Sequence, residues 1–433
     1  MSKQRYIWLL ISLFMVYTQG LWERLFSLPP GTTIMLELPL WTYFFLSFKK
    51  FLKPTPARLW IIIYILFAFF VSVANNTSII ELAKYIRFFL YFYLLYASLW
   101  NSRLSNKQWL TLLKFGIFLI IIQGLGSAFN IFVLGQRIEG HVGLMSTLGG
   151  TIASTFPLVI VSIITVLFLF ARKQGRKFNW ILLLIIISTV LVGYGSGKRA
   201  IFFTIPLFIS ITTLISFFYQ KGNAVFYRKI IGIVLIAILS VPLYIFGITT
   251  SKGFNYDLSG NENKLEVLIT ALTYAQEYEK STSQYGTTTG RSGTTLQVIN
   301  DSFSSFDKFL FGYGFRSYKD ESTAYAIGFT YGIVGFTRDI ISGGWLVMLL
   351  TFLIISKIIL ANKSYNYKLT SVLRLIIFAV FVFTHFGYSS DFAVSLKINF
   401  LLLILLVFIN SPANSNYLKF AVEHYFYSGL KKK

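Results

Sequence analysis

The sequence predicts an all-α protein that crosses a membrane about twelve times and carries one large polar loop outside the membrane. Hydrophobic residues make up 55% of its 433 residues, which is more apolar surface than the core of one soluble domain can bury. These residues are grouped into stretches close to the ~20 residues that a membrane-spanning helix needs, and a helix satisfies every backbone hydrogen bond inside lipid. One long segment, residues 250–340, is polar instead.

The predicted spans follow one another along the chain. Five lie in the first third of the sequence, at residues 6–19, 32–47, 59–74, 85–99 and 108–129. Four more precede the polar loop, at 151–170, 180–195, 200–218 and 230–248, and three follow it, at 341–360, 373–386 and 394–409. The predicted organisation is therefore a first set of spans in 1–249, a loop with the active site in 250–340, a second set of spans in 341–411 and a basic tail in 412–433.

Orientation follows from the basic residues, because short loops rich in Lys and Arg stay in the cytoplasm. If the amino terminus is cytoplasmic, the basic clusters at residues 49–58 and 172–177 and the lysines at 431–433 all lie on that side. Both termini are then inside and the polar loop is outside. The net charge of +23 reflects this topology rather than nucleic-acid binding, and the absence of cysteine excludes disulfides and thiol chemistry.

Some basic residues break this pattern, and they are candidate functional residues because an ionisable group near lipid is costly. They lie at predicted outer positions: Arg24, Lys84, Arg87, Arg137, Lys198, Arg199, Arg291, Arg316, Arg338 and Lys397. Two sets also have simpler explanations. Arg137 and Glu139 could pair with each other, and Lys198 and Arg199 follow a glycine-rich turn where they could contact either a bound anion or lipid phosphates.

The polar loop has internal order. Apolar residues recur at helical spacing within 262–280 and within 296–310, which predicts two amphipathic helices resting on the outer leaflet. Next comes Gly312-Tyr313-Gly314, where glycines let the backbone approach a ligand and an aromatic ring can stack on a sugar. The histidines are too scattered to predict a metal site, at His141, His385 and His424.

In its predicted topology and in several short motifs, the chain resembles the bacterial O-antigen polymerase and ligase group of integral membrane glycosyltransferases, nearest to the Wzy-type polymerases. The resemblance in topology lies in the predicted order of the spans and the large loop. The short motifs are Ser-Gly-Lys-Arg-Ala at 196–200, Arg137 with Gly140, and Arg291 ahead of Phe-Gly-Tyr-Gly at 311–314 and Tyr-Gly-Ile-Val-Gly at 331–335. The ligases usually carry a His-Asn pair where this chain has Glu321 and Ser322, which argues against a ligase.

The resemblance implies transfer of a glycan from undecaprenyl pyrophosphate to a hydroxyl of the next lipid-linked unit, with no cofactor. Arginine suits the leaving pyrophosphate because its guanidinium is always charged and binds phosphate oxygens in pairs. The expected catalytic residues are Arg291, Arg316 and the base Glu321, with Glu139, Asp320 and Asp339 as alternative bases. The expected pyrophosphate-binding residues are Arg137, Lys198, Arg199, Arg338, Gly312, Tyr313 and Gly314. No paired-aspartate metal motif occurs in the loop, so we expect arginines in place of a metal.

The resemblance also sets the expected location and partners. It implies a bacterial inner-membrane protein that binds undecaprenyl-pyrophosphate-linked oligosaccharide and membrane lipids, and that works with a separate chain-length regulator on O-antigen, capsule or exopolysaccharide. A ligase or other lipid-linked glycan transferase is one alternative. A flippase for the same lipid-linked sugars is another, since its span count would be equal, although transport does not require so long a loop.

Overall fold

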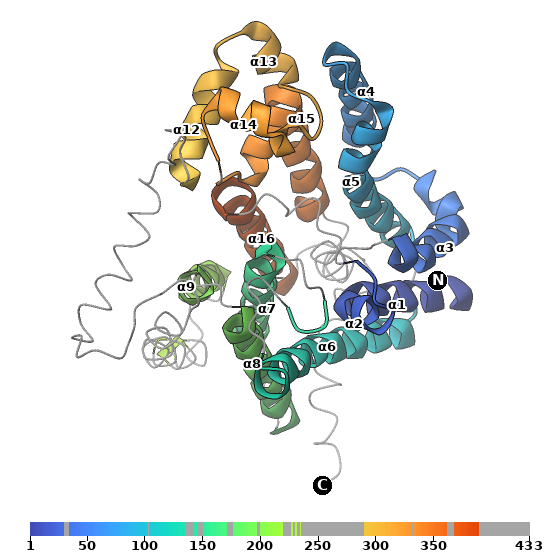
Figure 1. Cartoon of the computed structure of the whole chain (residues 1–433). Coiled ribbons are helices and arrows are strands. Elements are labelled where there is room, and N and C mark those ends of the chain that lie inside the picture. The colour runs from blue at the N-terminus through green and yellow to red at the C-terminus, as the bar shows by residue number, and fades with distance from the viewer. Residues whose placement is uncertain are drawn as a thin grey trace, which may run out of the picture.

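The computed structural model describes residues 1–29, 34–102, 104–135, 142–145, 150–170, 176–196, 200–219, 290–330, 332–361 and 368–388, with isolated residues between 227 and 234. All the regular secondary structure in these ranges is helical, which confirms the predicted all-α class for the part of the chain that they cover. The elements run from blue to red along the chain in Figure 1.

The first half of the chain forms a series of long helices. They are α1 (Lys3–Tyr17), α2 (Gln19–Leu25), α3 (Ile34–Phe51), α4 (Arg58–Ala74), α5 (Ile79–Trp100), α6 (Asn106–Ala128) with the π turn η1 (Phe129–Val133), α7 (Gly150–Phe170), α8 (Arg176–Ser196) and α9 (Ala200–Tyr219). Two of these helices, α5 and α6, begin at residues whose side chains cap them. Ser78 accepts a hydrogen bond from the amide of Glu81, and Ser105 forms a capping box with Gln108.

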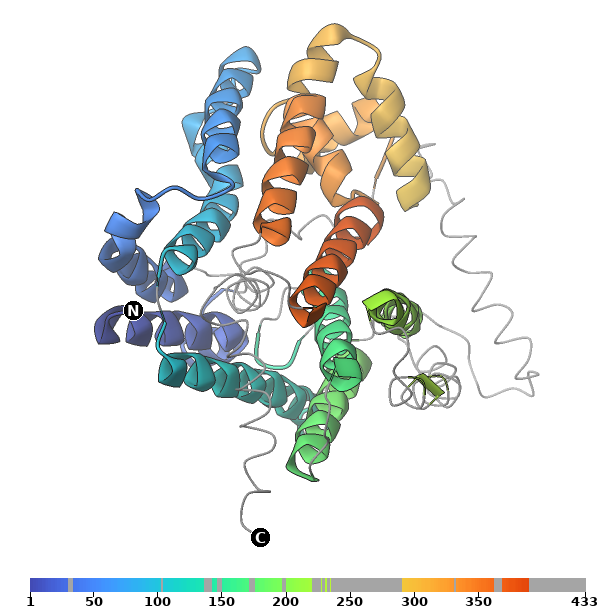
Figure 2. The same ribbon diagram turned by 180° about the vertical axis from the view of Figure 1, so that it is seen from behind.

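The second half begins with short helices and ends with long ones. They are α12 (Arg291–Ser302), α13 (Phe306–Phe311), η2 (Ser317–Lys319), α14 (Glu321–Ile327), α15 (Gly335–Leu360), α16 (Lys368–Val382) and the π turn η3 (Phe383–Tyr388). Residues 290–330, called the α12–α14 unit below, lie at one end of α15 and beside α4 in Figures 1 and 2. The helix expected at 296–310 is thus two helices that part at residues 303–305.

Three of the described helices are long and apolar enough to cross a membrane: Lys107–Val133, Gly335–Leu360 and Ser371–Tyr388. Shorter apolar helices occupy other predicted spans, at Arg58–Ala74, Phe89–Trp100, Thr155–Leu169, Trp180–Ser196 and Thr204–Tyr219. These observations do not support a count of twelve. The predicted spans at 230–248 and 394–409, the tail at 412–433 and the amphipathic helix at 262–280 lie outside the described residues.

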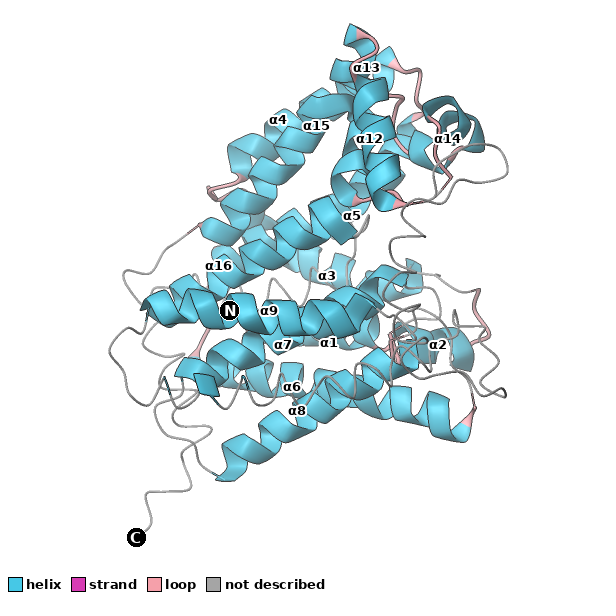
Figure 3. Ribbon diagram, turned by 90° about the vertical axis from the view of Figure 1, so that its left-hand side faces the viewer, coloured by secondary structure: helices cyan, strands magenta, loops and turns pink. Residues whose placement is uncertain are grey.

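The long helices pack side by side. Neighbouring pairs include α1 with α3, α3 with α5, α4 with α15, α6 with α8, and α16 with α7 and α9, and Figure 3 shows them from the side. One apolar core joins them and is rich in buried aromatic rings, among them Tyr43, Tyr64, Tyr96 and Phe381. The core brings α5, α15 and α16 together next to the α12–α14 unit, and this is where the candidate site lies.

Helix α15 begins earlier than the sequence predicted, and this corrects the boundary of the polar loop. The predicted span started at residue 341, whereas the helix starts at Gly335. The hydroxyl of Thr337 accepts a hydrogen bond from the amide of Val334 and caps the new start. Arg338 and Asp339, expected on the loop, are therefore in the first turns of a buried helix.

The same helix is broken at Gly343 and Gly344, which have non-helical backbone angles. The chain around Gly312 (φ +61°) fills the break, and the amide of Tyr313 donates to the carbonyl of Ile341 over 2.7 Å. A Cβ on Gly312 would lie 2.5 Å from that carbonyl oxygen, and one on Gly344 (φ +73°) would overlap the carbonyl of Leu310. Only glycine fits at both positions, so the two segments interlock.

Candidate functional site

A buried charged centre lies where α5, α15 and η3 meet. Asp339 accepts hydrogen bonds on Oδ1 from Nη2 of Arg338 at 2.7 Å, from Nε of Arg338 at 3.0 Å and from the hydroxyl of Tyr85 at 2.8 Å. The guanidinium of Arg338 also lies 5.7 Å from the centre of the Tyr85 ring. Arg338 is 2% exposed and Asp339 is fully buried. The two charges thus compensate each other inside the protein, as a buried ion pair must.

His385, on the π turn η3, completes this centre. Its Nε2 lies 3.5 Å from Oδ2 of Asp339, and the ring is fully buried. Among the described residues, Oδ2 of Asp339 and both ring nitrogens of His385 have no hydrogen-bond partner. Buried polar atoms without partners are rare and mark either function or a bound water molecule. The π turn η3 sets the direction of this histidine, and π turns recur at functional sites.

Arg316 belongs to a second, half-exposed cluster. Its Nη1 donates to Oε2 of Glu81, at the start of α5, over 2.7 Å. The other oxygen of Glu81 accepts from Nζ of Lys84 at 2.9 Å. The pKa of Glu81 is lowered, first by the hydrogen bond from Lys84 and then by Arg316. Arg316 has a left-handed backbone with φ +69°, which is uncommon for a residue other than glycine.

Arg291 has a different environment. It is the first residue of α12, and its guanidinium lies 4.7 Å from the centre of the Tyr388 ring. Within the described part of the chain Arg291 forms no ion pair with a carboxylate, unlike Arg316 and Arg338. A cation over an aromatic face keeps its hydrogen-bond donors free for another partner. Of Arg291, Arg316 and Arg338, Arg291 is therefore the one most open to an added anion.

The three arginines are connected through two helices. On α5, Glu81 and Tyr85 are one turn apart, so the partner of Arg316 and the partner of Asp339 lie next to each other. On η3, His385 and Tyr388 likewise link Asp339 to Arg291. The arginines that the sequence placed on one loop are thus connected through residues of α5 and η3, each beside a different partner.

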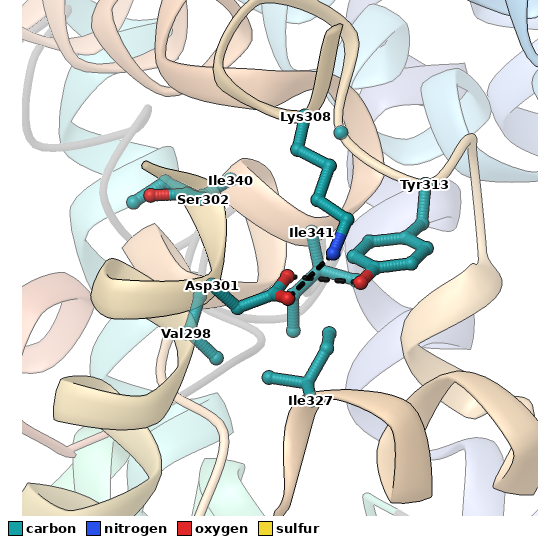
Figure 4. Close-up of a pocket in the computed structure, with 9 residues that line it drawn as sticks. Val298, Asp301, Ser302, Lys308, Tyr313, Ile327, Ile340 and Ile341 are labelled. Carbon is teal, nitrogen blue, oxygen red and sulfur yellow. Dashed lines mark hydrogen bonds and ion pairs between the residues drawn. The ribbon is translucent and has the colours of Figure 1, made fainter. Parts of the chain in front are cut away.

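Tyr313, Gly312 and Gly314 lie beside this end without forming an open sugar site. The hydroxyl of Tyr313 donates to Asp301 over 2.9 Å, and Nζ of Lys308 lies 2.6 Å from the same carboxylate. These side chains point toward one another in Figure 4, around a small recess. They leave space there for about one water molecule rather than for a sugar ring. Gly314 packs against Thr77.

The pKa values in this recess are shifted by the same contacts. The hydrogen bond to Asp301 raises the pKa of Lys308, and partial burial raises the pKa of Tyr313. Both shifts favour the protonated forms, so the ion pair and the tyrosine hydroxyl are in place at neutral pH. This polar cluster ties α12 to the chain that fills the break in α15.

The predicted bases lie in two settings. Glu321 and Asp320 are exposed at the start of α14, whereas Asp339 is buried with Arg338. Lys319, the cation that could neutralise the exposed pair, lies 5.9 Å from the centre of its neighbour's ring, Tyr318. The remaining site predictions lie outside the described residues, at Arg137, Glu139, Lys198 and Arg199.

The sequence pattern did not predict three polar residues of the site. Tyr85 and Glu81 lie at the outer end of a predicted span, and His385 was read as an isolated histidine. One signal was present: Lys84, one residue from Tyr85, is a basic residue on the side where few are expected. Another anomalous cation, Arg87, is explained by Glu37, whose Oε1 lies 3.6 Å from Nη2. Ion pairs between helices, such as this one, depend on how the helices pack, and the sequence pattern does not predict that packing.

The sequence was compared with known protein families and with curated proteins. No family model matches it, and no curated protein does. Within the described residues no three His, Asp or Glu side chains gather where they could hold a metal ion. The features of this chain that indicate a function are the three arginines and their partners.

Proposed function

We propose that the protein polymerises lipid-linked oligosaccharide units at the outer face of a bacterial inner membrane, with about twelve spans and both termini in the cytoplasm. The observation that carries this proposal is the connection of Arg291, Arg316 and Arg338 through their partners on α5 and η3. A lipid-linked donor delivers its pyrophosphate near the membrane surface. Fixed cations beside apolar helices suit that anion better than they suit a neutral ligand.

The reaction breaks the bond between the donor sugar and its pyrophosphate oxygen, and the electron pair leaves with the pyrophosphate. The acceptor hydroxyl forms the new glycosidic bond, and its proton passes to a base. Arginine donors stabilise the charge that grows on the leaving oxygen. Arg291 fits this role best, because its guanidinium lies over an aromatic ring and forms no ion pair with a carboxylate of the described residues. We assign the base to Glu321, which is exposed and free of the buried pairing that holds Asp339.

A transporter of lipid-linked oligosaccharides is the second candidate, and the break at Gly343 and Gly344 favours it. Transporters bind substrates and ions at discontinuous helices. In this chain, however, the segment around Gly312 occupies the break with its own backbone. The break therefore serves an internal contact, and we rank transport below glycosyl transfer.

Substitution of Arg291 tests the proposal. Arg291→Ala should lower polymer formation by about 10² or more, as removal of a transition-state donor does, and Arg291→Lys should rescue it poorly because a point charge cannot bind two oxygens at once. Polymer length is measured in membranes supplied with lipid-linked repeat units, at equal protein levels. Lys319→Ala, which removes an exposed cation outside the arginine group, is the matched control and should retain activity.

A deletion strain separates the candidate functions. Accumulation of single repeat units on the outer face identifies a polymerase, and absence of any lipid-linked unit from that face identifies a transporter. Full activity of Arg291→Ala in the membrane assay would refute the proposed role of this arginine. Glu321→Gln, compared with Asp320→Asn, tests the base in the same assay, and wild-type activity of Glu321→Gln would remove Glu321 from the mechanism.

A further inference from the structure

One carboxylate at the start of α5 is shared by two cations. Glu81 binds Lys84 with one oxygen, at 2.9 Å, and Arg316 with the other, at 2.7 Å. The side chains of Lys84, Glu81 and Arg316 are 52%, 34% and 28% exposed, so solvent reaches all three. Arg316 comes from a segment far along the chain, which means that tertiary structure, and not the local helix, brings it to Glu81.

The direction of Arg316 is fixed by the turn that carries it. Its left-handed backbone lies between Gly314, which packs against Thr77 in the turn before α5, and Ser317, whose hydroxyl donates to the carbonyl of Gly314 over 2.7 Å. A strained conformation persists only where the surrounding structure enforces it. The backbone of Arg316 is therefore held beside the start of α5 independently of the bond to Glu81.

The bond to Glu81 is of a kind that an anion can replace. Ion pairs that solvent reaches contribute little to stability, whereas a buried pair cannot lose one partner without a large penalty. The Arg316–Glu81 pair is half-exposed and the Arg338–Asp339 pair is buried. A phosphate group offers more charge and more acceptor oxygens than a carboxylate, and guanidinium binds it through two parallel hydrogen bonds.

We propose that Arg316 and Lys84 form a phosphate subsite, and that Glu81 occupies this subsite in the absence of ligand. The inference rests on the proposed function, since the pyrophosphate of a lipid-linked donor is the ligand that it would receive. When phosphate enters, the carboxylate of Glu81 turns away to solvent and both cations transfer to the phosphate oxygens. Glu81 then sets the affinity of the site and keeps it closed to weak anions.

The test measures binding of inorganic pyrophosphate to the purified full chain in lipid nanodiscs by calorimetry. Glu81→Gln removes the competing charge and should tighten binding about fivefold, the scale of a half-exposed ion pair. Lys84→Gln and Arg316→Ala remove donors and should weaken it about fivefold and about tenfold. Asp301→Asn is the matched control: it removes a carboxylate that also pairs with a lysine, at 2.6 Å, but within the filled recess, and should leave affinity unchanged.

The outcomes separate this inference from the proposed function. Unchanged affinity in Glu81→Gln, or an equal gain in Asp301→Asn, overturns the subsite even if the membranes polymerise normally. The predicted changes in affinity, in membranes that form no polymer, support the subsite and reject the polymerase. Nanodiscs of zwitterionic phosphatidylcholine and of anionic phosphatidylglycerol separate the two sources of phosphate: a gain for Glu81→Gln in phosphatidylcholine alone shows that the subsite also accepts anionic lipid headgroups.

Discussion

At the scale of single residues, pairing decides which of the charged side chains can act on a ligand. Arg338 and Asp339 satisfy each other inside the protein, Arg316 shares a solvent-exposed carboxylate, and Arg291 lies over an aromatic ring. The sequence predicted the arginines as a group of candidates. It did not predict this ranking, because the partners Tyr85, Glu81 and His385 come from other helices.

Removal of the buried carboxylate should destabilise the protein. Asp339→Asn leaves the charge of Arg338 buried without compensation, which typically costs about 3 to 5 kcal/mol. Thermal unfolding of the purified protein in detergent measures the loss. Glu321→Gln, at an exposed position, should change stability by no more than about 0.5 kcal/mol. Equal melting temperatures for the two variants would show that the Arg338–Asp339 pair does not stabilise the fold.

At the scale of elements, the apolar stretches of the sequence predicted several helices closely but missed the start of α15 and the break within it. The apolar pattern predicted α4, α6 and α7 closely, because each is a continuous apolar stretch. It missed the start of α15, since the polar pair Arg338 and Asp339 looks like loop when its buried partners are unknown. It also missed the break in the same helix, because two adjacent glycines mark either a flexible stretch or a tertiary contact equally well.

The interlock at that break should be intolerant of a single methyl group. Gly344→Ala places Cβ onto the carbonyl of Leu310 at a positive φ, so we expect a loss of more than about 1 kcal/mol in stability. Gly116→Ala is the control, because Gly116 is within α6 and has no atom within 4 Å of a new Cβ. That substitution should stabilise the helix by roughly 0.5 to 1 kcal/mol. A destabilised Gly116→Ala together with a neutral Gly344→Ala would contradict the interlock.

The Lys308–Asp301 pair predicts a pH dependence at the same junction. Asp301 raises the pKa of Lys308 in the folded protein, so the pair stabilises the fold below the unfolded lysine pKa of about 10.4 and ceases to do so as the pH rises through the raised value. The effect should stay below about 1 kcal/mol because the pair is partly exposed. Denaturation should therefore separate wild type from Asp301→Asn at pH 8, and the separation should be smaller at pH 11.

At the scale of the whole molecule, the predicted orientation can be tested directly because the chain has no cysteine. Ser304 is exposed between α12 and α13, and a cysteine there should react with an impermeant maleimide in intact spheroplasts. A cysteine at Ser283 should behave in the same way. Cysteines at Ser364 and Ser415 should react only after permeabilisation. The reverse pattern would place the arginine group in the cytoplasm and end the proposal of an outer-face enzyme.

The sequence predicted the fold class better than it predicted the arrangement of the helices. Composition alone predicted the helical class that the described residues show, since helices accommodate so many apolar residues most simply. Neither the order of packing nor the junction of α5, α15 and η3 follows from composition, because a helix such as α4 is apolar both on the side that packs and on the side that does not.

The break in α15 has a consequence for the thickness of the surrounding membrane. Residues 345–360, beyond the break, measure about 24 Å at 1.5 Å per residue, which is less than the ~30 Å of a typical hydrocarbon layer. In a membrane-spanning α15, the part that carries Arg338 and Asp339 would then either enter the apolar layer or make that layer thinner locally. In both cases the buried pair would lie closer to the acyl chains than a loop would. Under the proposed function, a lipid-linked substrate would not need to lift its head group far from the bilayer to reach the arginines.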